Sequence, residues 1–176
     1  MIDFSRNHFE LLGVPERFAL DPDALERSYR ALQSEIHPDR HATADAAARR
    51  LALQSSARVN EAYRALRDPV DRAQYLLALH GIDALAETDS VLAPEFLERQ
   101  LERREAASDA LTARDAPALE HLLADVREES VALERRLAAL LDGESAWDAA
   151  RARVRELKFL GKIAADVDDM LGELDS

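Results

Sequence analysis

The sequence predicts an all-α protein built from two helical modules that a linker joins. Ala, Leu, Glu and Arg dominate the 176 residues, whereas Gly and Pro, which disrupt helices, occur only 5 and 6 times. Apolar residues recur at three- and four-residue spacing, and no segment alternates apolar and polar residues as a half-buried strand does. We therefore expect an N-terminal module over residues 1–81, a linker over residues 82–93 and a C-terminal module over residues 94–176.

The N-terminal module is expected to begin with two helices. The first covers residues 9–12 and stops at Gly13. The second starts at Pro22, with Asp21 as its N-cap. It ends before Pro38, because proline disfavours helical backbone at the preceding residue and cannot donate a backbone hydrogen bond. The apolar face of this second helix comprises Leu25, Tyr29, Leu32 and Ile36.

Two further helices complete the module, over residues 44–66 and 70–79. The longer one places small or apolar residues on one face, at Ala48, Ala52, Ser55, Val59, Ala62 and Leu66. These residues would let it pack closely against the second helix as an antiparallel pair. Asp68-Pro69 marks the turn before the last helix, and His80-Gly81 closes that helix.

The C-terminal module is expected to hold three long helices. The first begins at Pro94, Asp115-Ala116-Pro117 separates it from a second that runs to Leu141, and a third covers residues 145–174 after a break at Asp142-Gly143-Glu144. The apolar stripe of the second helix comprises Leu119, Leu122, Val126, Leu133, Leu137 and Leu140. That of the third comprises Trp147, Ala150, Val154, Leu157, Gly161, Ala164 and Leu171. Short connections between amphipathic helices predict an antiparallel three-helix bundle.

Composition excludes several classes of protein and site. Cysteine is absent, so the chain has no disulfide, thiolate nucleophile or cysteine-based metal site. It has no Gly-rich phosphate loop, and we expect the protein itself to bind neither ATP nor another cofactor. The N-terminus lacks the apolar run of a signal peptide, and no apolar run approaches the roughly 18 residues of a membrane span. We expect a soluble, cytoplasmic protein.

The net charge of −12 is concentrated in the second half of the chain. Residues 1–80 hold 11 basic and 12 acidic side chains, a balance of −1, whereas residues 81–176 hold 12 basic and 23 acidic ones, a balance of −11. Phosphates would be repelled by the acidic half, which argues against a nucleic-acid partner. The asymmetry predicts two modules with different partners.

The second helix is followed by His37-Pro38-Asp39-Arg40, which the pattern places at the tip of a helical hairpin. Arg27 and Arg30 lie off the apolar face of that helix and should project to solvent. Two exposed arginines are compatible with an ordinary solvated face. They are equally compatible with a docking surface, because Arg40 lies at the same end of the molecule. Periodicity alone leaves both interpretations open.

An enzymatic site at this tip is the sharpest alternative. His37, Asp39 and His41 could ligate a metal ion, or His37 and Asp39 could form an acid–base pair. No pocket that would exclude water is evident at a hairpin tip, and no further ligand is fixed by spacing. We therefore expect neither catalysis nor a metal site there. The histidines expected at the surface are His8 and His121.

Parts of the N-terminal module resemble a J domain. Its signature is a His-Pro-Asp sequence between two amphipathic helices, and residues 60–69 with Arg72 and Tyr75 are also similar to that domain. A J domain often carries Asp after this tyrosine, whereas Leu76 follows it here. Residues 75–81, 96–105, 144–150 and 154–160 resemble the HscB family of J-domain co-chaperones, which act in iron–sulfur cluster assembly. The likeness covers nearly the whole chain in order.

The resemblance implies two protein partners. In this family the His-Pro-Asp end stimulates the ATPase of a heat-shock-type chaperone, HscA, and the C-terminal bundle binds the cluster scaffold protein, IscU. ATPase activation is thereby assigned to His37, Pro38 and Asp39, and chaperone docking to Arg27, Arg30 and Arg40. Scaffold binding is assigned to Leu97, Glu98, Leu101, Glu102, Glu105, Asp109 and Phe159. The chain departs from the family pattern at Glu98, where an apolar residue can occur, and at Arg40, where lysine is common.

A J-domain co-chaperone for general protein folding is the alternative function. The chain lacks the Gly/Phe-rich and zinc-binding segments of such proteins, which disfavours it. A preference of the purified protein for unfolded chains over the cluster scaffold would favour it.

Helical periodicity supports the second site independently of the resemblance. At 100° per residue, with Leu97 at zero, Leu101 falls at about 40°. The four acidic positions of the site fall at about 80° to 140°, and the expected core residues Phe96, Ala107 and Leu111 fall at about −100° to −40°. The two leucines therefore border an acidic face. On the last helix Phe159 lies outside the core arc, so it should be partly exposed.

Overall fold

The computed structural model describes residues 2–36, 46–86 and 92–174. All regular elements within these ranges are helices, which confirms the predicted all-α class. The chain divides into two compact units, residues 1–80 (unit 1) and residues 81–176 (unit 2).

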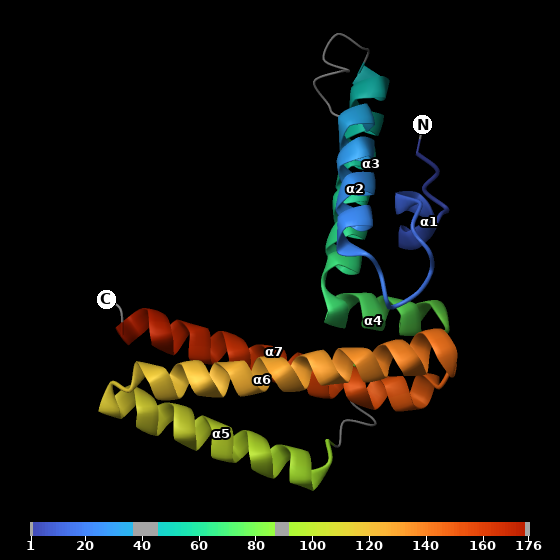
Figure 1. Ribbon diagram of the computed structural model, residues 1–176. Coiled ribbons are helices and arrows are strands. Elements are labelled where there is room, and N and C mark those ends of the chain that lie inside the picture. The colour runs from blue at the N-terminus through green and yellow to red at the C-terminus, as the bar shows by residue number, and fades with distance from the viewer. Residues whose placement is uncertain (1, 37–45, 87–91, 175–176) are drawn as a thin grey trace. The chain divides into compact units, whose positions relative to one another are not determined.

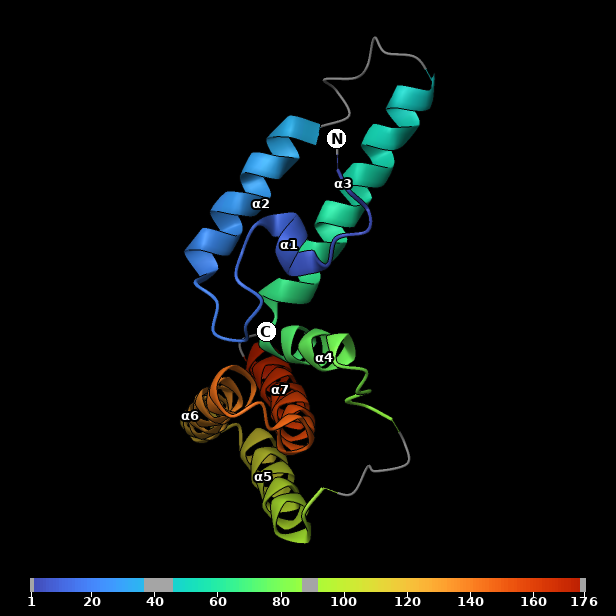
Figure 2. The ribbon, with the colours of Figure 1, turned by 90° about the vertical axis from the view of Figure 1, so that its right-hand side faces the viewer.

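Unit 1 is built around an antiparallel pair of helices, α2 (Pro22–Ile36) and α3 (Ala46–Arg67) (Figure 1). The short helix α1 (His8–Leu12) packs against both of them (Figure 2). The helix α4 (Pro69–Leu79) follows α3 directly and contacts it. Gly13 ends α1 in the left-handed conformation, at φ 63°, which glycine adopts without steric cost.

Close packing of α3 explains how this pair of helices forms. The residues of α3 that face the unit's core are buried, and they are Ala52, Ser55, Val59, Ala62 and Leu66. Four of the five are small or β-branched, so the helices packed against this face can approach α3 closely. Large side chains from α1 and α4, including Phe9, Leu12 and Leu77, fill the remaining core. The predicted packing face of α3 is confirmed.

His8 is buried, with 5% of its surface exposed, and the expectation of a surface histidine was wrong. Its ring stacks on Tyr75 at 4.2 Å between centroids, and its backbone N–H donates to the Tyr75 hydroxyl at 3.0 Å. This contact joins α1 to α4, 67 residues apart, so helical periodicity within α1 could not reveal it. Burial lowers the pKa of His8, because the charged form loses its solvation.

The lowered pKa predicts a pH dependence of stability. The folded state holds His8 neutral, so between its lowered pKa and the ordinary value of 6.5 the unfolded chain binds more protons. The contribution of His8 to the free energy of unfolding should therefore shrink as the pH falls below 6.5. The variant His8→Phe retains a ring for stacking. Its melting temperature should fall less than that of the wild type when the pH is lowered from 7.5 to 5.5. Equal losses in calorimetric melts of the two proteins would contradict this expectation.

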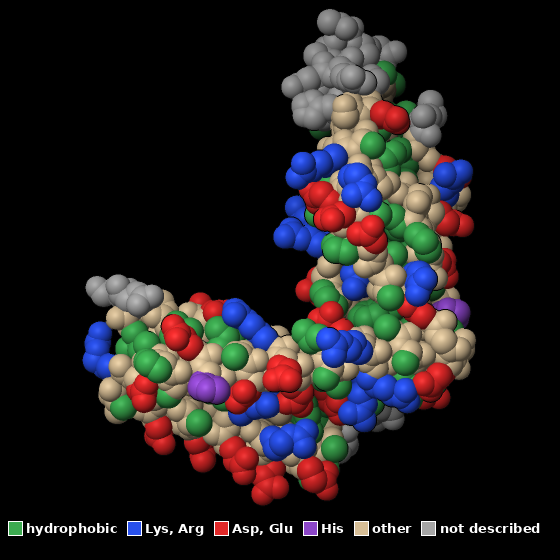
Figure 3. All heavy atoms as spheres, viewed as in Figure 1, with side chains coloured by type: hydrophobic (Ala, Val, Ile, Leu, Met, Phe, Trp, Pro, Cys, Tyr) green, Lys and Arg blue, Asp and Glu red, His purple; other side chains and the backbone are tan. Residues whose placement is uncertain are grey.

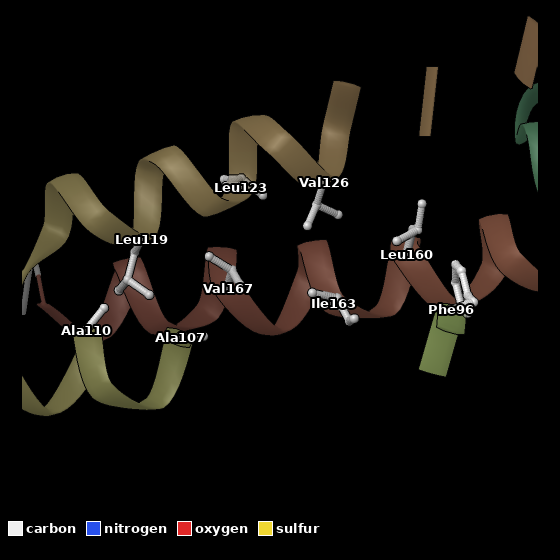
Figure 4. Close-up of a cluster of buried hydrophobic side chains, with 9 residues drawn as sticks. All are labelled: Phe96, Ala107, Ala110, Leu119, Leu123, Val126, Leu160, Ile163 and Val167. Carbon is white, nitrogen blue, oxygen red and sulfur yellow. The ribbon is translucent and has the colours of Figure 1, made fainter. Parts of the chain in front are cut away.

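Unit 2 is a bundle of α5 (Pro94–Ala113), α6 (Ala116–Ala138) and α7 (Trp147–Leu174). The helix α6 runs antiparallel to its two neighbours, so α5 and α7 run in the same direction (Figure 1). This confirms the predicted antiparallel three-helix bundle. Its core is a cluster of nine buried residues drawn from all three helices (Figure 4), namely Phe96, Ala107, Ala110, Leu119, Leu123, Val126, Leu160, Ile163 and Val167.

The connection between α6 and α7 differs from the expectation. We expected a regular helix up to Leu141, but α6 ends at Ala138 and a π-helical turn, Ala139–Gly143, follows it. The adjacent residues Leu140 and Leu141 are both buried in this turn. An ordinary helix would point such neighbours about 100° apart. The wider turn is therefore compatible with the burial of both leucines.

The buried face of α7 turns along its length. In the first half of the helix Ala150, Val154 and Leu157 are buried. In the second half the buried residues are Leu160, Ile163 and Val167, and they lie on a face rotated by about 100° about the helix axis from the first. Gly161, which we expected in the core stripe, consequently lies on the exposed side. A single stripe drawn over the whole helix misses this change.

Part of the segment expected to be a linker is anchored to α7. Ala84 is 3% exposed. The guanidinium of Arg155 donates to the carbonyl oxygens of Ala84, at 2.8 Å, and Ala86, at 2.7 Å. Arg155 thus ties residues 84–86 to α7 within unit 2.

Candidate functional site

The predicted ATPase-activating residues His37, Pro38 and Asp39, and the predicted docking residue Arg40, lie outside the described residues. The helices that flank this segment are described. The last residue of α2 is Ile36, and α3 is described from Ala46.

The other two predicted docking residues, Arg27 and Arg30, lie on the exposed side of α2, with 71% and 77% of their side chains exposed. Arg27 is 3.8 Å from Asp21, a distance typical of a weak surface pair. Arg30 donates from Nε to Glu26 at 2.6 Å, one turn earlier on the same helix. The expected exposure of both arginines is confirmed.

Arg30 belongs to a hydrogen-bonded network that crosses from α2 to α3. Glu26, its partner, also accepts a hydrogen bond from the Tyr63 hydroxyl of α3. The bond from Tyr63 and that from Arg30 lower the pKa of Glu26, because both favour its charged form. The rings of Tyr63 and Tyr29 stack at 4.1 Å, and the Tyr29 hydroxyl donates to Asn60 at 2.9 Å. The network depends on the register of α2 against α3, and sequence patterns gave no signal for it.

In unit 2, α5 displays the predicted apolar pair of the second site. Leu97 and Leu101 are 39% and 62% exposed, although each is a large apolar side chain. Four acidic residues surround them, namely Glu98, Glu102, Glu105 and Asp109. All four are exposed, and none forms an ion pair within the described part of the chain. Acidic side chains gather along α5 at the lower edge of the molecule in Figure 3. The helix thus presents leucines bordered by unpaired carboxylates.

Phe159 of α7 lies beside this surface and also belongs to the structure of the bundle. It is half-buried, so its predicted partial exposure is confirmed. It packs against the core cluster, and its ring meets Phe96 edge-on at 5.9 Å between centroids. The helical wheel did not predict this contact, because the contact requires α5 to lie against α7. Part of the ring is therefore structural, and only the exposed remainder is available to a partner.

The opposite side of α5 is tied to α6. Glu129 of α6 pairs with Arg103 at 2.6 Å and with Arg99 at 3.7 Å. Gln100, also on this side, is only 2% exposed and accepts a hydrogen bond from Arg103 at 3.1 Å. Together with the buried residues Phe96, Ala107 and Ala110, these contacts hold this side of α5 against the bundle. Leu97 and Leu101 consequently face away from the core.

The described residues contain no other arrangement that indicates chemistry. No group of three or more His, Asp or Glu side chains in that part of the chain could hold a metal ion. None of its helices is long and apolar enough to cross a lipid bilayer. What the two units offer is protein surface: exposed arginines on α2 and leucines among carboxylates on α5.

Comparison with known proteins identifies both units. Residues 7–75 match the family model of the DnaJ domain, and residues 92–168 match that of the HSCB C-terminal oligomerisation domain. A relative from Burkholderia multivorans named co-chaperone protein HscB homolog is 45% identical over 176 residues, which cover 100% of both chains. A relative of the same name from Ralstonia nicotianae is 48% identical over 171 residues, 97% of each chain.

A solved structure agrees with these relatives. Chaperone HscB from Vibrio cholerae superposes with a TM-score of 0.85 at 37% sequence identity, covering 96% of this chain and 99% of that one. The similarity therefore spans both helical units in sequence and in fold. The chain belongs to the HscB family of J-domain co-chaperones.

Proposed function

We propose that this co-chaperone stimulates the ATPase of a dedicated heat-shock-type chaperone, HscA, and delivers the iron–sulfur cluster scaffold, IscU, to it. In this proposal residues 1–81 act as the J domain, residues 82–93 as a linker and residues 94–176 as the scaffold-binding domain. Delivery would aid cluster maturation and transfer. The protein itself needs no catalytic centre for this role.

The observation that carries the proposal is the full-length relation to HscB co-chaperones, which joins a DnaJ domain to the HscB-type C-terminal domain in one chain. A J domain alone would fit a co-chaperone for any unfolded client. The C-terminal domain adds a surface of its own, where exposed leucines lie among carboxylates that have no ion-pair partner within the described residues. Such a surface suits a folded, basic partner better than an unfolded chain.

Within each unit the proposed roles differ. His37, Pro38 and Asp39 activate the ATPase, and Arg27, Arg30 and Arg40 guide docking through their positive charge. The scaffold contacts the residues of unit 2 predicted above, with Leu97, Leu101 and the exposed part of Phe159 as the apolar portion of the site. Glu98, Glu102, Glu105 and Asp109 select a basic patch on the scaffold.

Affinity capture from the native lysate tests the proposal as a whole. The tagged wild-type protein should recover both a heat-shock-type ATPase and an iron–sulfur scaffold. Recovery of unfolded chains in place of the scaffold would favour a role in general folding. Recovery of neither protein would contradict the proposal.

Docking of the J unit is expected to depend on salt. The two described arginines of the proposed docking surface are exposed, and exposed charges are screened over about 8 Å at 0.15 M salt. Arg27→Ala/Arg30→Ala should slow association with the chaperone, because such charges act mainly on the association rate. Raising the salt should slow the wild type more than this variant in surface plasmon resonance.

A matched variant separates this effect from a general loss of positive charge. Arg127→Ala/Arg135→Ala removes two exposed charges from α6 of unit 2, and it should associate with the chaperone as the wild type does. A wild-type affinity that stays flat between low and high salt would indicate an apolar docking face instead.

A further inference from the structure

A groove runs along the seam between α5 and α7, beyond the leucines of the scaffold surface. Its volume is about 410 Å³, and Ala107, Leu111, Ile163, Val167 and Met170 supply its apolar surface. The helices α5 and α7 run in parallel (Figure 1), and successive contacts join them from one end to the other. The contacts are Phe96 with Phe159, Arg104 with Asp166 and Arg114 with the Leu174 carbonyl. The groove therefore continues the surface of Leu97, Leu101 and Phe159 toward the C-terminal ends of both helices.

Charge at the rim of this groove is unbalanced. The two arginines of the rim are engaged within unit 2, Arg103 by Glu129 at 2.6 Å and Arg104 by Asp166 at 3.7 Å. Two further carboxylates line the groove, those of Asp169 and Glu173. Both are exposed, and neither forms an ion pair within the described ranges. An occupant with positive charge would supply the missing counter-charge.

The Arg104–Asp166 pair crosses the seam where the leucine surface meets the groove. Its atoms are 3.7 Å apart, and the two side chains are 52% and 44% exposed. Pairs of this kind contribute little to stability because water competes for both charges. A lysine or arginine from a partner could therefore take the place of Arg104 at Asp166 with little loss to the fold.

We infer that this groove binds a basic segment of the iron–sulfur scaffold, one that carries an apolar side chain between Lys or Arg residues. This inference rests on the proposed function and extends its scaffold surface. The apolar side chain would lie between Leu111 and Met170, and the flexible, unbranched Met170 can adapt to its shape. The basic residues would face Asp166, Asp169 and Glu173. The same partner is inferred because the groove is continuous with the leucine surface and carries charge of the same sign.

Isothermal titration of the full chain with the purified IscU-type scaffold tests this inference. Asp169→Asn/Glu173→Gln keeps the shape of both side chains and should weaken binding about three- to tenfold at low salt, as expected for two exposed ion pairs. Glu120→Gln/Glu128→Gln removes the same charge from exposed positions of α6 and should change binding by less than about twofold, because distant charges are screened. Arg104→Gln should tighten binding about two- to fivefold, since it frees Asp166 for the partner.

The outcomes separate failure of this inference from failure of the proposed function. Leu101→Ala reports on the leucine surface alone. If Leu101→Ala weakens binding but Asp169→Asn/Glu173→Gln binds like its α6 control, the groove is not occupied and only this inference fails. The inference also fails if Arg104→Gln weakens binding. If the wild type does not bind the scaffold at all, both the function and the inference are overturned.

Discussion

Replacing His37 with Gln is expected to reduce stimulation of the partner ATPase to the rate of the chaperone alone. The described helix α2 ends at the residue before His37; Leu25 on its apolar face is buried, and Tyr29, Leu32 and Ile36 on that face are half-buried. In the proposed role the imidazole of His37, the next residue along the chain, acts on the partner ATPase and does not hold the fold together. Because surface substitutions change stability by about 0.5 kcal/mol or less, the variant should keep its helicity and melting temperature.

Steady-state ATP hydrolysis by the chaperone, titrated with each variant, measures this effect. His121→Gln is the matched control, because it makes the same chemical change at an exposed position of α6. The control should stimulate like the wild type. Full stimulation by His37→Gln would contradict the proposed role of His37 in ATPase activation.

The double variant Leu97→Ala/Leu101→Ala should weaken scaffold binding at least about tenfold. Fully burying a leucine is worth about 1.5–3 kcal/mol, and these side chains are already part-buried, at 39% and 62% exposure. The remaining exposed area of the two, about that of one whole leucine, then accounts for about 1.5–3 kcal/mol of binding, or roughly 10- to 150-fold in Kd. Reversing two of the nearby acids should weaken binding less at physiological salt, because exposed ion pairs are worth about 0–1 kcal/mol each.

Phe159 needs separate treatment because of its contact with Phe96. Adding Phe159→Ala to the leucine variant should abolish detectable binding, but it also removes a ring from the edge of the core. Truncating a core aromatic typically costs about 3–5 kcal/mol, and a half-buried ring should cost less. The triple variant is therefore expected to melt earlier than the double variant, so loss of binding by the double variant is the clearer result.

Titration calorimetry with the scaffold, alongside thermal melts, separates the possible outcomes. Val131→Ala is a suitable control, since Val131 is an apolar residue of α6 that is 45% exposed. It should leave scaffold binding unchanged. Normal binding by the double leucine variant would place the site elsewhere, and unfolding of that variant would mean that the leucines belong to the core.

The helices and their packing faces were predictable because their signals are local. Gly13 ends α1, Asp68 caps α4 by accepting from the Asp71 backbone N–H, and α3 buries the predicted face of small residues. The exposure of Leu97 and Leu101 was predictable for the same reason. Their position relative to the core depends only on the rotation of one regular helix.

Features that depend on contacts between helices escaped prediction. His8 is buried because Tyr75, far along the chain, covers it. The hydrogen bond from Tyr63 to Glu26 depends on the register between α3 and α2. Glu129 pairs with Arg99 and Arg103 of another helix, and nothing in the spacing of α6 distinguishes it from the other acids of that helix.

Departures from regular helix geometry were missed for a different reason. A helical wheel assumes one angle per residue and one core direction for each helix. The π-helical turn after α6 violates the first assumption. The turning core face of α7, which leaves Gly161 exposed, violates the second.

The central claim, that one chain links an ATPase to a cluster scaffold, is tested most directly by ATP hydrolysis in a reconstituted mixture. The HscA-type chaperone is assayed with the wild-type co-chaperone alone, with the IscU-type scaffold alone and with both together. We expect the two together to stimulate hydrolysis by more than the sum of their separate effects, because the co-chaperone brings the scaffold to the chaperone that it activates. Hydrolysis that stays at the chaperone's own rate in all three mixtures would contradict the claim.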